Sequence, residues 1–285
     1  MLRKLHGLLI LVRFELPLAA GICTVIGELV ALDHLPPLRI ILLGFSSVFL
    51  LSAAALILND VFDVESDRIN APHRPIPSGM VSIREVVIFF ILVTLTGLAL
   101  ATLITFQAFL VAFFVWVIGF LYNWKFKKLG LVGNMMVSFS VGMTFFFGGI
   151  AVNNPFSTPV IFFSLWSFFF NLGEEISADA MDMEGDNEAG SKSLAIKFGR
   201  EAAIRVGASI FFFVIAASSL PFIFGWFELV FLPPILFADA ITLISAIQLL
   251  NPNTANRRKW IRWIYLSGLV AMIGFLIIHI YRVIS

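Results

Sequence analysis

The sequence is poor in three kinds of residue, and each scarcity excludes a class of protein. A single cysteine, Cys23, rules out a disulfide within the chain. The four histidines are scattered, so no His/Cys set has the spacing of a transition-metal site. Charged residues make up 13% of the chain and the net charge is +1. That balance gives no electrostatic reason to expect nucleic-acid binding.

What the chain has in abundance is apolar sequence. Of its 285 residues 60% are hydrophobic, and the mean hydropathy is +0.99. The apolar stretches run to roughly 20 residues without alternation, which is the length of a membrane-spanning helix and not the pattern of a β-barrel. We therefore predict an all-α, polytopic membrane protein with nine spans, at approximately 9–31, 37–58, 82–104, 107–123, 131–152, 158–177, 202–224, 227–249 and 261–283.

The basic residues test this topology. With nine spans, 17 of the 19 lysines and arginines fall on the N-terminal side of the membrane, and only Arg39 and Arg282 fall on the other. Because positive charge is retained on the cytosolic side, the N-terminus is predicted to be cytosolic in a multi-pass protein of the cell membrane.

The most informative pattern is an acidic spacing that occurs twice. Acidic residues at offsets 0, 3, 5 and 7 begin at Asp60 and again at Asp179, 119 residues later, each time at the cytosolic end of a span. On a helix, offsets 0, 3 and 7 share a sector of about 60°, and offset 5 points away. Each motif thus predicts one face of three aspartates, with Glu65 and Glu184 turned outward. The repeat also suggests two pseudo-equivalent halves, spans 2–5 and 6–9, within one domain over residues 1–285.

For one acidic run, a solvated loop with capping residues is an adequate explanation. Two runs with the same spacing on the same side of the membrane favour a cation site, because oxygen donors are the ligands that Mg²⁺ prefers. Mg²⁺ held by few carboxylates typically bridges to phosphates, so we expect a diphosphate substrate. The candidate metal ligands are Asn59, Asp60, Asp63, Asp67, Asp179, Asp182 and Asp186.

Further polar residues lie near these two faces. Glu175 and Asn171 precede Asp179 by four and eight residues and share its helical stripe. Glu175 is interpreted either as a seventh acid of the site or as a helix-end residue facing water. The cations available to a diphosphate on this side are Arg68, Arg74, Lys125, Lys127, Lys128 and Lys192, among which we favour Arg74 with Lys125 or Lys127.

These residues resemble the signatures of the UbiA-type intramembrane prenyltransferases. The matching stretches are NDVFDVESD (59–67), RINAPHRPIPSG (68–79), YN (122–123), GN (133–134), FFFGGIA (145–151), DAMDMEGD (179–186) and GSKSL (190–194). The resemblance implies nine helices around a central cavity that opens to the lipid, with Mg²⁺ bound by two aspartate clusters. Three positions depart from the family pattern: Leu16, often Asn; Glu174, often Arg; and Ala178, often basic.

Within the family, the YN, GN and FFFGGIA stretches lean towards archaeal members. The resemblance then implies transfer of a geranylgeranyl group from geranylgeranyl diphosphate to the C2 hydroxyl of geranylgeranylglyceryl phosphate, in the synthesis of archaeal ether phospholipids. The acceptor would be a lipid-like alcohol. Asp63, Asp67, Asp182 and Asp186 are the expected catalytic residues, together with Tyr122, whose ring would stabilise an allylic cation.

Two alternatives stay open at this point. One is prenyl transfer to an aromatic or tetrapyrrole acceptor, which would need stacking side chains where a phosphorylated lipid needs a basic subsite. The other is a cation-coupled transporter, which would place its acidic residues near the middle of the bilayer. The position of both motifs at span ends, beside loops rich in Pro and Gly, favours the enzyme.

Overall fold

The computed structural model describes residues 2–32, 34–188 and 190–284, and within these ranges every regular element is a helix. The first half contains α1 (Leu2–Val12), α2 (Glu15–Leu32), α3 (Leu38–Phe62), α4 (Val64–Asn70), α5 (Ile83–Thr102), α6 (Phe106–Leu121), the π-helical turn η1 (Tyr122–Phe126), the 3₁₀ turn η2 (Lys127–Leu129) and α7 (Leu131–Ala151). The second half contains α8 (Thr158–Glu188), α9 (Leu194–Phe198), α10 (Arg200–Ser218), α11 (Leu220–Ile223), the 3₁₀ turn η3 (Leu229–Phe231), α12 (Leu232–Leu250) and α13 (Arg258–Ile284).

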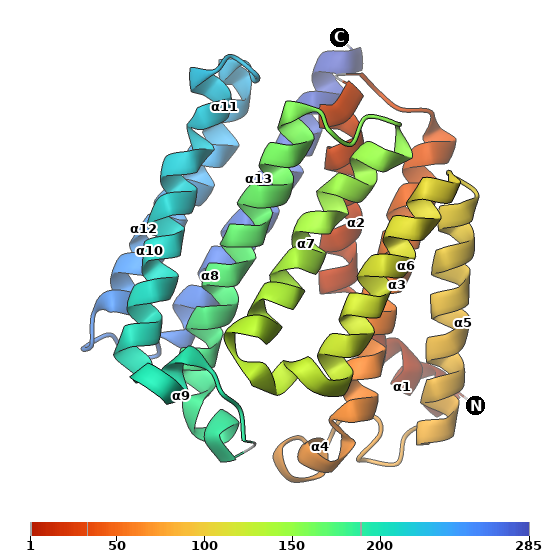
Figure 1. The fold of residues 1–285 in the computed structure, drawn as a ribbon, viewed down its shortest axis with the longest axis vertical. Coiled ribbons are helices and arrows are strands. Elements are labelled where there is room, and N and C mark those ends of the chain that lie inside the picture. The colour runs from red at the N-terminus through yellow and green to blue at the C-terminus, as the bar shows by residue number, and fades with distance from the viewer. Residues whose placement is uncertain (1, 33, 189, 285) are drawn as a thin grey trace.

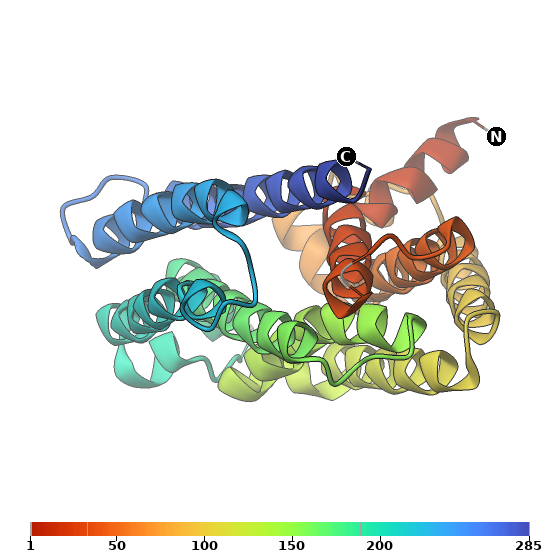
Figure 2. The same cartoon turned by 90° about the horizontal axis from the view of Figure 1, so that it is seen from above.

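The long helices run up and down through one bundle. In Figure 1 the N-terminus, α4 and α9 lie at the lower end and the C-terminus lies at the upper end. Figure 2 shows the blue α12 and α13 on one side of the bundle and the green α7 and α8 on the other. The chain is therefore a multi-pass helical membrane protein, as its hydropathy predicts.

Eight of the nine predicted spans coincide with helical segments of the described chain that are long and apolar enough to cross a membrane. The ninth, 158–177, lies in α8, which is not among those eight because it carries Asn171, Glu174 and Glu175 along its length. The count of nine stays a prediction.

The predicted start of the first span, residue 9, is wrong. The helix is interrupted at Arg13, whose φ of 48° is left-handed, and the spanning helix α2 begins at Glu15. Arg13 and Glu15 interrupt the apolar run at this point, but a charged residue alone does not mark a break in the backbone. The break places Arg13 at the end of the bundle that carries the acidic motifs. There its guanidinium forms an ion pair with Asp60 of the first motif.

Glycines bring α2 and α7 into close contact. A Cβ atom at Gly27 would lie 2.3 Å from the carbonyl oxygen of Phe145, and one at Gly148 would lie 2.2 Å from that of Thr24. Only glycine allows the two backbones to approach so closely, a packing mode that membrane helices use widely. α7 packs in turn on α8, and this second contact joins the first half of the chain to the second.

The two acidic motifs sit on different local structures at the same end of the bundle. The first spans the junction of α3 and α4, where Asp63 leaves helical geometry with φ −89° and ψ 1°. The second lies within α8, which continues without a break to Glu188. The two motifs therefore share their residue spacing but not their backbone conformation.

Candidate functional site

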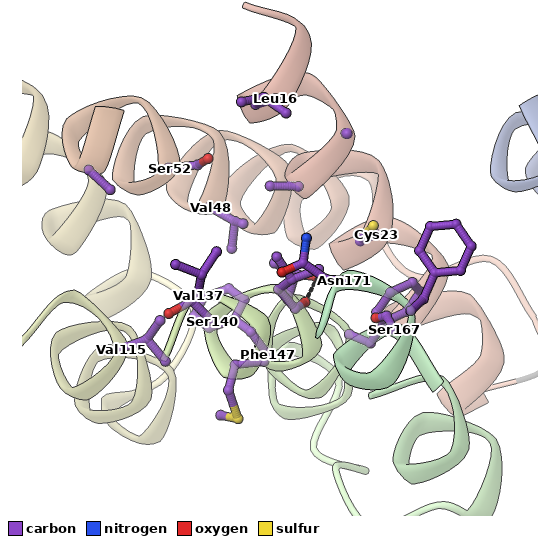
Figure 3. A pocket seen from close by; sticks show the side chains of 18 of the residues that line it. Leu16, Cys23, Val48, Ser52, Val115, Val137, Ser140, Phe147, Ser167 and Asn171 are labelled. Atoms are coloured by element: carbon purple, nitrogen blue, oxygen red, sulfur yellow. Dashed lines mark hydrogen bonds between the residues drawn. The ribbon is translucent and has the colours of Figure 1, made fainter. Parts of the chain in front are cut away.

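A cavity of about 590 Å³ runs along the inside of the bundle, between α2, α3, α6, α7, α8 and α13. Figure 3 shows side chains pointing into it from α2 (Leu16, Cys23), α3 (Val48, Ser52) and α8 (Ser167, Asn171). Its lining is mostly apolar. Its charged and amide side chains gather, together with Tyr122, at the end that carries the acidic motifs: Arg13, Asn59, Asn123, Asn171, Glu174 and Glu175.

Two aspartates of the first motif are held by arginines. Asp60 is buried and forms ion pairs with Arg13 and, at 3.3 Å, with Arg74. Arg74 Nη1 also donates to both carboxylate oxygens of Asp67, each at 2.7 Å. Partial burial disfavours the charge of Arg74, but its acidic partners, Asp67 first, leave the pKa of the guanidinium above its ordinary value. This network ties the 71–82 loop to the end of α3.

The third aspartate of this motif, Asp63, is paired with a lysine from a different part of the chain. Lys127, in the turn after α6, forms an ion pair with Asp63. With its nitrogen turned towards Asp63, the Asn59 amide donates to Asp63 Oδ2 at 2.9 Å and accepts from Lys127 Nζ at 3.0 Å. Asn123, buried in η1, lies 2.9 Å from the same amide. The Asn59 amide therefore lies between the Asp63 carboxylate and the Lys127 ammonium.

The second motif spreads its aspartates over three neighbours. Asp179 accepts a hydrogen bond of 2.9 Å from Asn134 Nδ2 on α7. Asp182 turns to α13, where it pairs with Arg258, and its side chain is 51% exposed. Burial raises the pKa of Asp186, which lies beyond the predicted span, and the Lys127 ammonium opposes that rise. The ion pair with Arg258 draws the Asp182 side chain towards α13 and away from Asp179, although the two residues share a sector of the helix.

The two motifs nevertheless meet at η1. Asp63 from the first motif and Asp179 and Asp186 from the second all act electrostatically on the Tyr122 hydroxyl, as does Glu175. Lys127 pairs with Asp63 and lies within electrostatic range of Asp186. In the described ranges no three acidic, histidine or cysteine side chains are already close enough to form a metal cage. Lysine and arginine side chains lie between the carboxylates.

The outward direction predicted for the two glutamates is observed. Glu65 is 84% exposed and pairs with Arg68, and Glu184 is 85% exposed and pairs with Arg200. Arg68 is therefore engaged on the outside of the motif. Of the other predicted cations, Arg74 and Lys127 contact the aspartates, whereas the side chains of Lys125 and Lys192 are exposed.

Residues of α8 that precede the second motif line the cavity. Glu175 faces the cavity and not the water, and Asn171 accepts a hydrogen bond of 3.2 Å from Ser138. Glu174 lies in the same wall and is also within electrostatic range of Arg262 on α13. The side of α8 that faces the cavity is therefore polar from Asn171 to Glu175.

Several residues of the site were not predicted from the sequence as members of it. They are Arg13, Asn123, Asn134, Glu174 and Arg258. For Arg13 a signal was available, since a single charge inside an apolar run is costly unless it is paired. The pairing of Arg258 with Asp182 joins residues 76 positions apart, and no local pattern indicates it.

A bundle of membrane helices with an apolar cavity, and with acidic motifs from both halves at its mouth, defines an intramembrane enzyme acting on a lipid with a charged head. Residues 20–269 match the UbiA prenyltransferase family model, and the chain belongs to that family. The sequence resemblance is thereby confirmed.

Individual proteins and solved structures are similar to almost the whole chain. The chain is 36% identical over 270 residues to the digeranylgeranylglyceryl phosphate synthase of Thermococcus kodakarensis, covering 93% of this chain and 95% of that protein. It is 31% identical to the synthase of Sulfurisphaera tokodaii, covering 90% and 93%. A solved structure of a digeranylgeranylglyceryl phosphate synthase superposes with a TM-score of 0.79 at 31% identity, covering 98% of this chain and 99% of that one. A UbiA homologue from Aeropyrum pernix K1 shares the fold, with a TM-score of 0.81 at 16% identity and coverage of 93% and 98%.

Proposed function

We propose that this protein transfers the geranylgeranyl group of geranylgeranyl diphosphate to the C2 hydroxyl of geranylgeranylglyceryl phosphate, forming the second ether bond of an archaeal phospholipid. The observation that carries the proposal is that Lys127 pairs with Asp63 of the first motif while Asn134, seven residues further along the chain, hydrogen-bonds Asp179 of the second, at the mouth of an apolar cavity. Such a site can hold a charged diphosphate and a hydrocarbon chain at once. The curated relatives that carry this activity in their names support the choice of substrates.

The donor set at the mouth suits Mg²⁺, because it consists of carboxylate and amide oxygens. We assign metal binding to Asn59, Asp63 and Asp67 on one side and to Asp179, Asp182 and Asp186 on the other. Asp60 is buried beneath two arginines, and we assign it the positioning of Arg13 and Arg74 instead. When bound, Mg²⁺ supplies positive charge that stabilises a departing diphosphate.

The chain's own residues then account for the rest of the reaction. Arg74 and Lys127 donate hydrogen bonds to the diphosphate, so the C1–O bond breaks with its electron pair going to the leaving group. The ring of Tyr122, between the two motifs, faces the allylic carbon and stabilises its positive charge. The acceptor hydroxyl oxygen forms the new bond to C1. Its proton passes to the released diphosphate or to a carboxylate near the mouth, such as Glu175, which faces the cavity.

Orientation and architecture complete the proposal. The mouth lies at the end of the bundle that carries 17 of the 19 basic residues, and we place this end at the cytosolic face of the cell membrane. We treat residues 1–285 as one transmembrane domain with a pseudo-repeat of spans 2–5 and 6–9. Water-soluble diphosphate would leave directly into the cytosol.

A product analysis with several acceptors tests this proposal. Purified protein is incubated with Mg²⁺ and geranylgeranyl diphosphate, and with geranylgeranylglyceryl phosphate, a quinone precursor or a tetrapyrrole alcohol in separate reactions. Mass spectrometry is expected to find the diether phosphate in the first reaction alone. A prenylated aromatic product with no diether would replace the proposed acceptor, and diphosphate-independent cation uptake into vesicles would indicate a transporter.

A further inference from the structure

We propose that Arg258 and Arg262 of α13 bind the phosphate of the lipid acceptor in a second cavity beside the main one. This inference rests on the proposed function and deepens it. It names the basic subsite that a phosphorylated acceptor requires and that an aromatic acceptor would not need.

The second cavity, of about 280 Å³, lies between the start of α2, the cytosolic half of α8 and the start of α13. Leu16, Glu174 and Tyr265 line both this cavity and the main one, so the two spaces share a wall. Its volume is close to the lower limit of small-molecule sites, which suits a small head group and leaves the hydrocarbon chains to the main cavity.

The basic residues of this cavity lie on one face of α13. Arg258, Arg262 and Tyr265 are spaced at offsets of 0, 4 and 7 residues, which places them within a sector of about 60°. Four residues of α-helix rise about 6 Å, so two guanidinium groups from neighbouring turns can bind one phosphate. Lys259 is about 100° from Arg258 around the helix and therefore lies off this face.

Both arginines are paired with carboxylates that a phosphate can replace. Arg258 pairs with Asp182, and Arg262 pairs with Glu15 at 2.7 Å. The four side chains are between 44% and 63% exposed, and ion pairs as exposed as these contribute little to stability. A phosphate dianion held by two guanidinium groups can therefore displace both carboxylates at little cost. The exchange also releases Asp182 for the metal site to which we assign it.

The same spacing places the reacting hydroxyl. In glycerol phosphate four bonds separate the C2 hydroxyl oxygen from the phosphorus atom, a distance of about 5 Å at ordinary bond lengths. Tyr265 is three residues beyond Arg262, or about 4.5 Å along α13, in the wall that the two cavities share. A phosphate bound at Arg262 therefore leaves the hydroxyl at the edge of the main cavity, where the prenyl diphosphate would lie.

The second cavity does not offer a comparable fit to an aromatic acceptor. Among the described residues that line it, Tyr265 is the only aromatic one. The Arg262 guanidinium lies over the Tyr265 ring, 5.1 Å from its centroid. The ring face that could stack on an aromatic head group is thus covered by a cationic side chain of the protein.

Steady-state kinetics of the full-length enzyme with geranylgeranyl diphosphate and geranylgeranylglyceryl phosphate test the proposal. Arg262→Gln should raise KM for the acceptor by roughly 10–100-fold, the effect of losing a hydrogen bond to a charged group, and should change KM for the diphosphate by less than about twofold. Arg262→Lys keeps the charge but not the planar fork, and its acceptor KM should fall between the two. An acceptor KM of wild-type value in Arg262→Gln would overturn the subsite and leave the proposed function intact.

Matched variants and a second acceptor separate the subsite from effects on folding. Lys259→Gln removes a cation from the same turn of α13 but off the inner face, and should keep the wild-type KM values. If Arg262→Gln does not fold, Arg258→Gln, at a side chain that is 63% exposed, should show the same rise in acceptor KM.

Geranylgeranylglycerol lacks the phosphate, so wild type and Arg262→Gln should use it with the same kcat/KM. An equal loss with both acceptors would show a structural role and overturn the subsite. A wild type that forms no diether from geranylgeranylglyceryl phosphate would instead overturn the proposed function.

Discussion

The two acidic motifs have the same spacing and opposite surroundings. In the first, every aspartate is paired with a cation: Asp60 with Arg13 and Arg74, Asp67 with Arg74, and Asp63 with Lys127. In the second, only Asp182 has a direct cationic partner, Arg258 on α13. Asp179 has only a neutral partner, Asn134, and Asp186 lies within electrostatic range of Lys127. We call the first motif the pre-paired half of the site, because each of its aspartates already has a cationic partner. The second motif, with fewer such partners, is the more open half.

This difference indicates a division of labour. The first motif fixes the basic side chains Arg13, Arg74 and Lys127 at the mouth, and in the proposed function its carboxylates would also face the substrate. The second motif, on one uninterrupted helix, brings carboxylates towards η1 with fewer partners to displace. We therefore expect removal of charge from the two motifs to affect stability and activity in different proportions.

The largest expected effect is on turnover. Asp63→Asn and Asp186→Asn should each lower kcat by at least about 10²–10³, the loss typical when a group that stabilises developing charge is removed. Glu65→Gln and Glu184→Gln, from the same two motifs but exposed, should leave kcat unchanged. Steady-state release of diphosphate measures all four. Equal losses of kcat in the glutamate variants would show that turnover responds to any loss of negative charge and not to these two aspartates in particular.

The next effect concerns the cation shared by the two motifs. Lys127→Met should raise KM for the prenyl diphosphate by roughly 10–100-fold, since a hydrogen bond to a charged group contributes about 1.5–3 kcal/mol. Lys128→Met removes a neighbouring exposed lysine and is the control. Similar KM values in both variants would remove Lys127 from the substrate site.

The free energy of unfolding should fall more when a charge is removed from the first motif than when one is removed from the second. Asp60→Asn leaves two arginines facing a neutral group at a buried position, and we expect a loss of about 2 kcal/mol in the free energy of unfolding. Asp179→Asn keeps an amide that can hydrogen-bond Asn134, so its stability should change little. Thermal unfolding in detergent, followed by circular dichroism, compares the two. A larger loss for Asp179→Asn would contradict the assignment of the first motif as the pre-paired half.

The smallest effect is expected at the outer face of α8. Arg258 and Asp182 are 63% and 51% exposed, and exposed ion pairs typically contribute about 0–1 kcal/mol. Arg258→Gln should therefore lower stability by less than about 1 kcal/mol. A double-mutant cycle with Asp182→Asn measures the coupling. If Arg258→Gln raises activity, the arginine competes with the metal for Asp182.

Much of this architecture could be predicted because it depends on patterns of period and composition. Long apolar runs fix the helices of the spans, and the angular argument correctly turns Glu65 and Glu184 outward. Side-chain pairing over long separations has no such local signal. The contacts of Asp60 with Arg13, of Asp63 with Lys127 and of Asp182 with Arg258 depend on which helices become neighbours. The break at Arg13 was missed for the same reason, since it is stabilised by a partner 47 residues away.

The central claim is that one carboxylate from each motif is required to hold the diphosphate through Mg²⁺. Equilibrium binding of geranylgeranyl diphosphate, measured with Mg²⁺ and with EDTA, tests it most directly in the wild type, Asp63→Asn, Asp186→Asn and the double variant. We predict tight binding that needs Mg²⁺ in the wild type, and weak binding indifferent to Mg²⁺ in all three variants. Mg²⁺-dependent binding of wild-type strength in either single variant would contradict the claim.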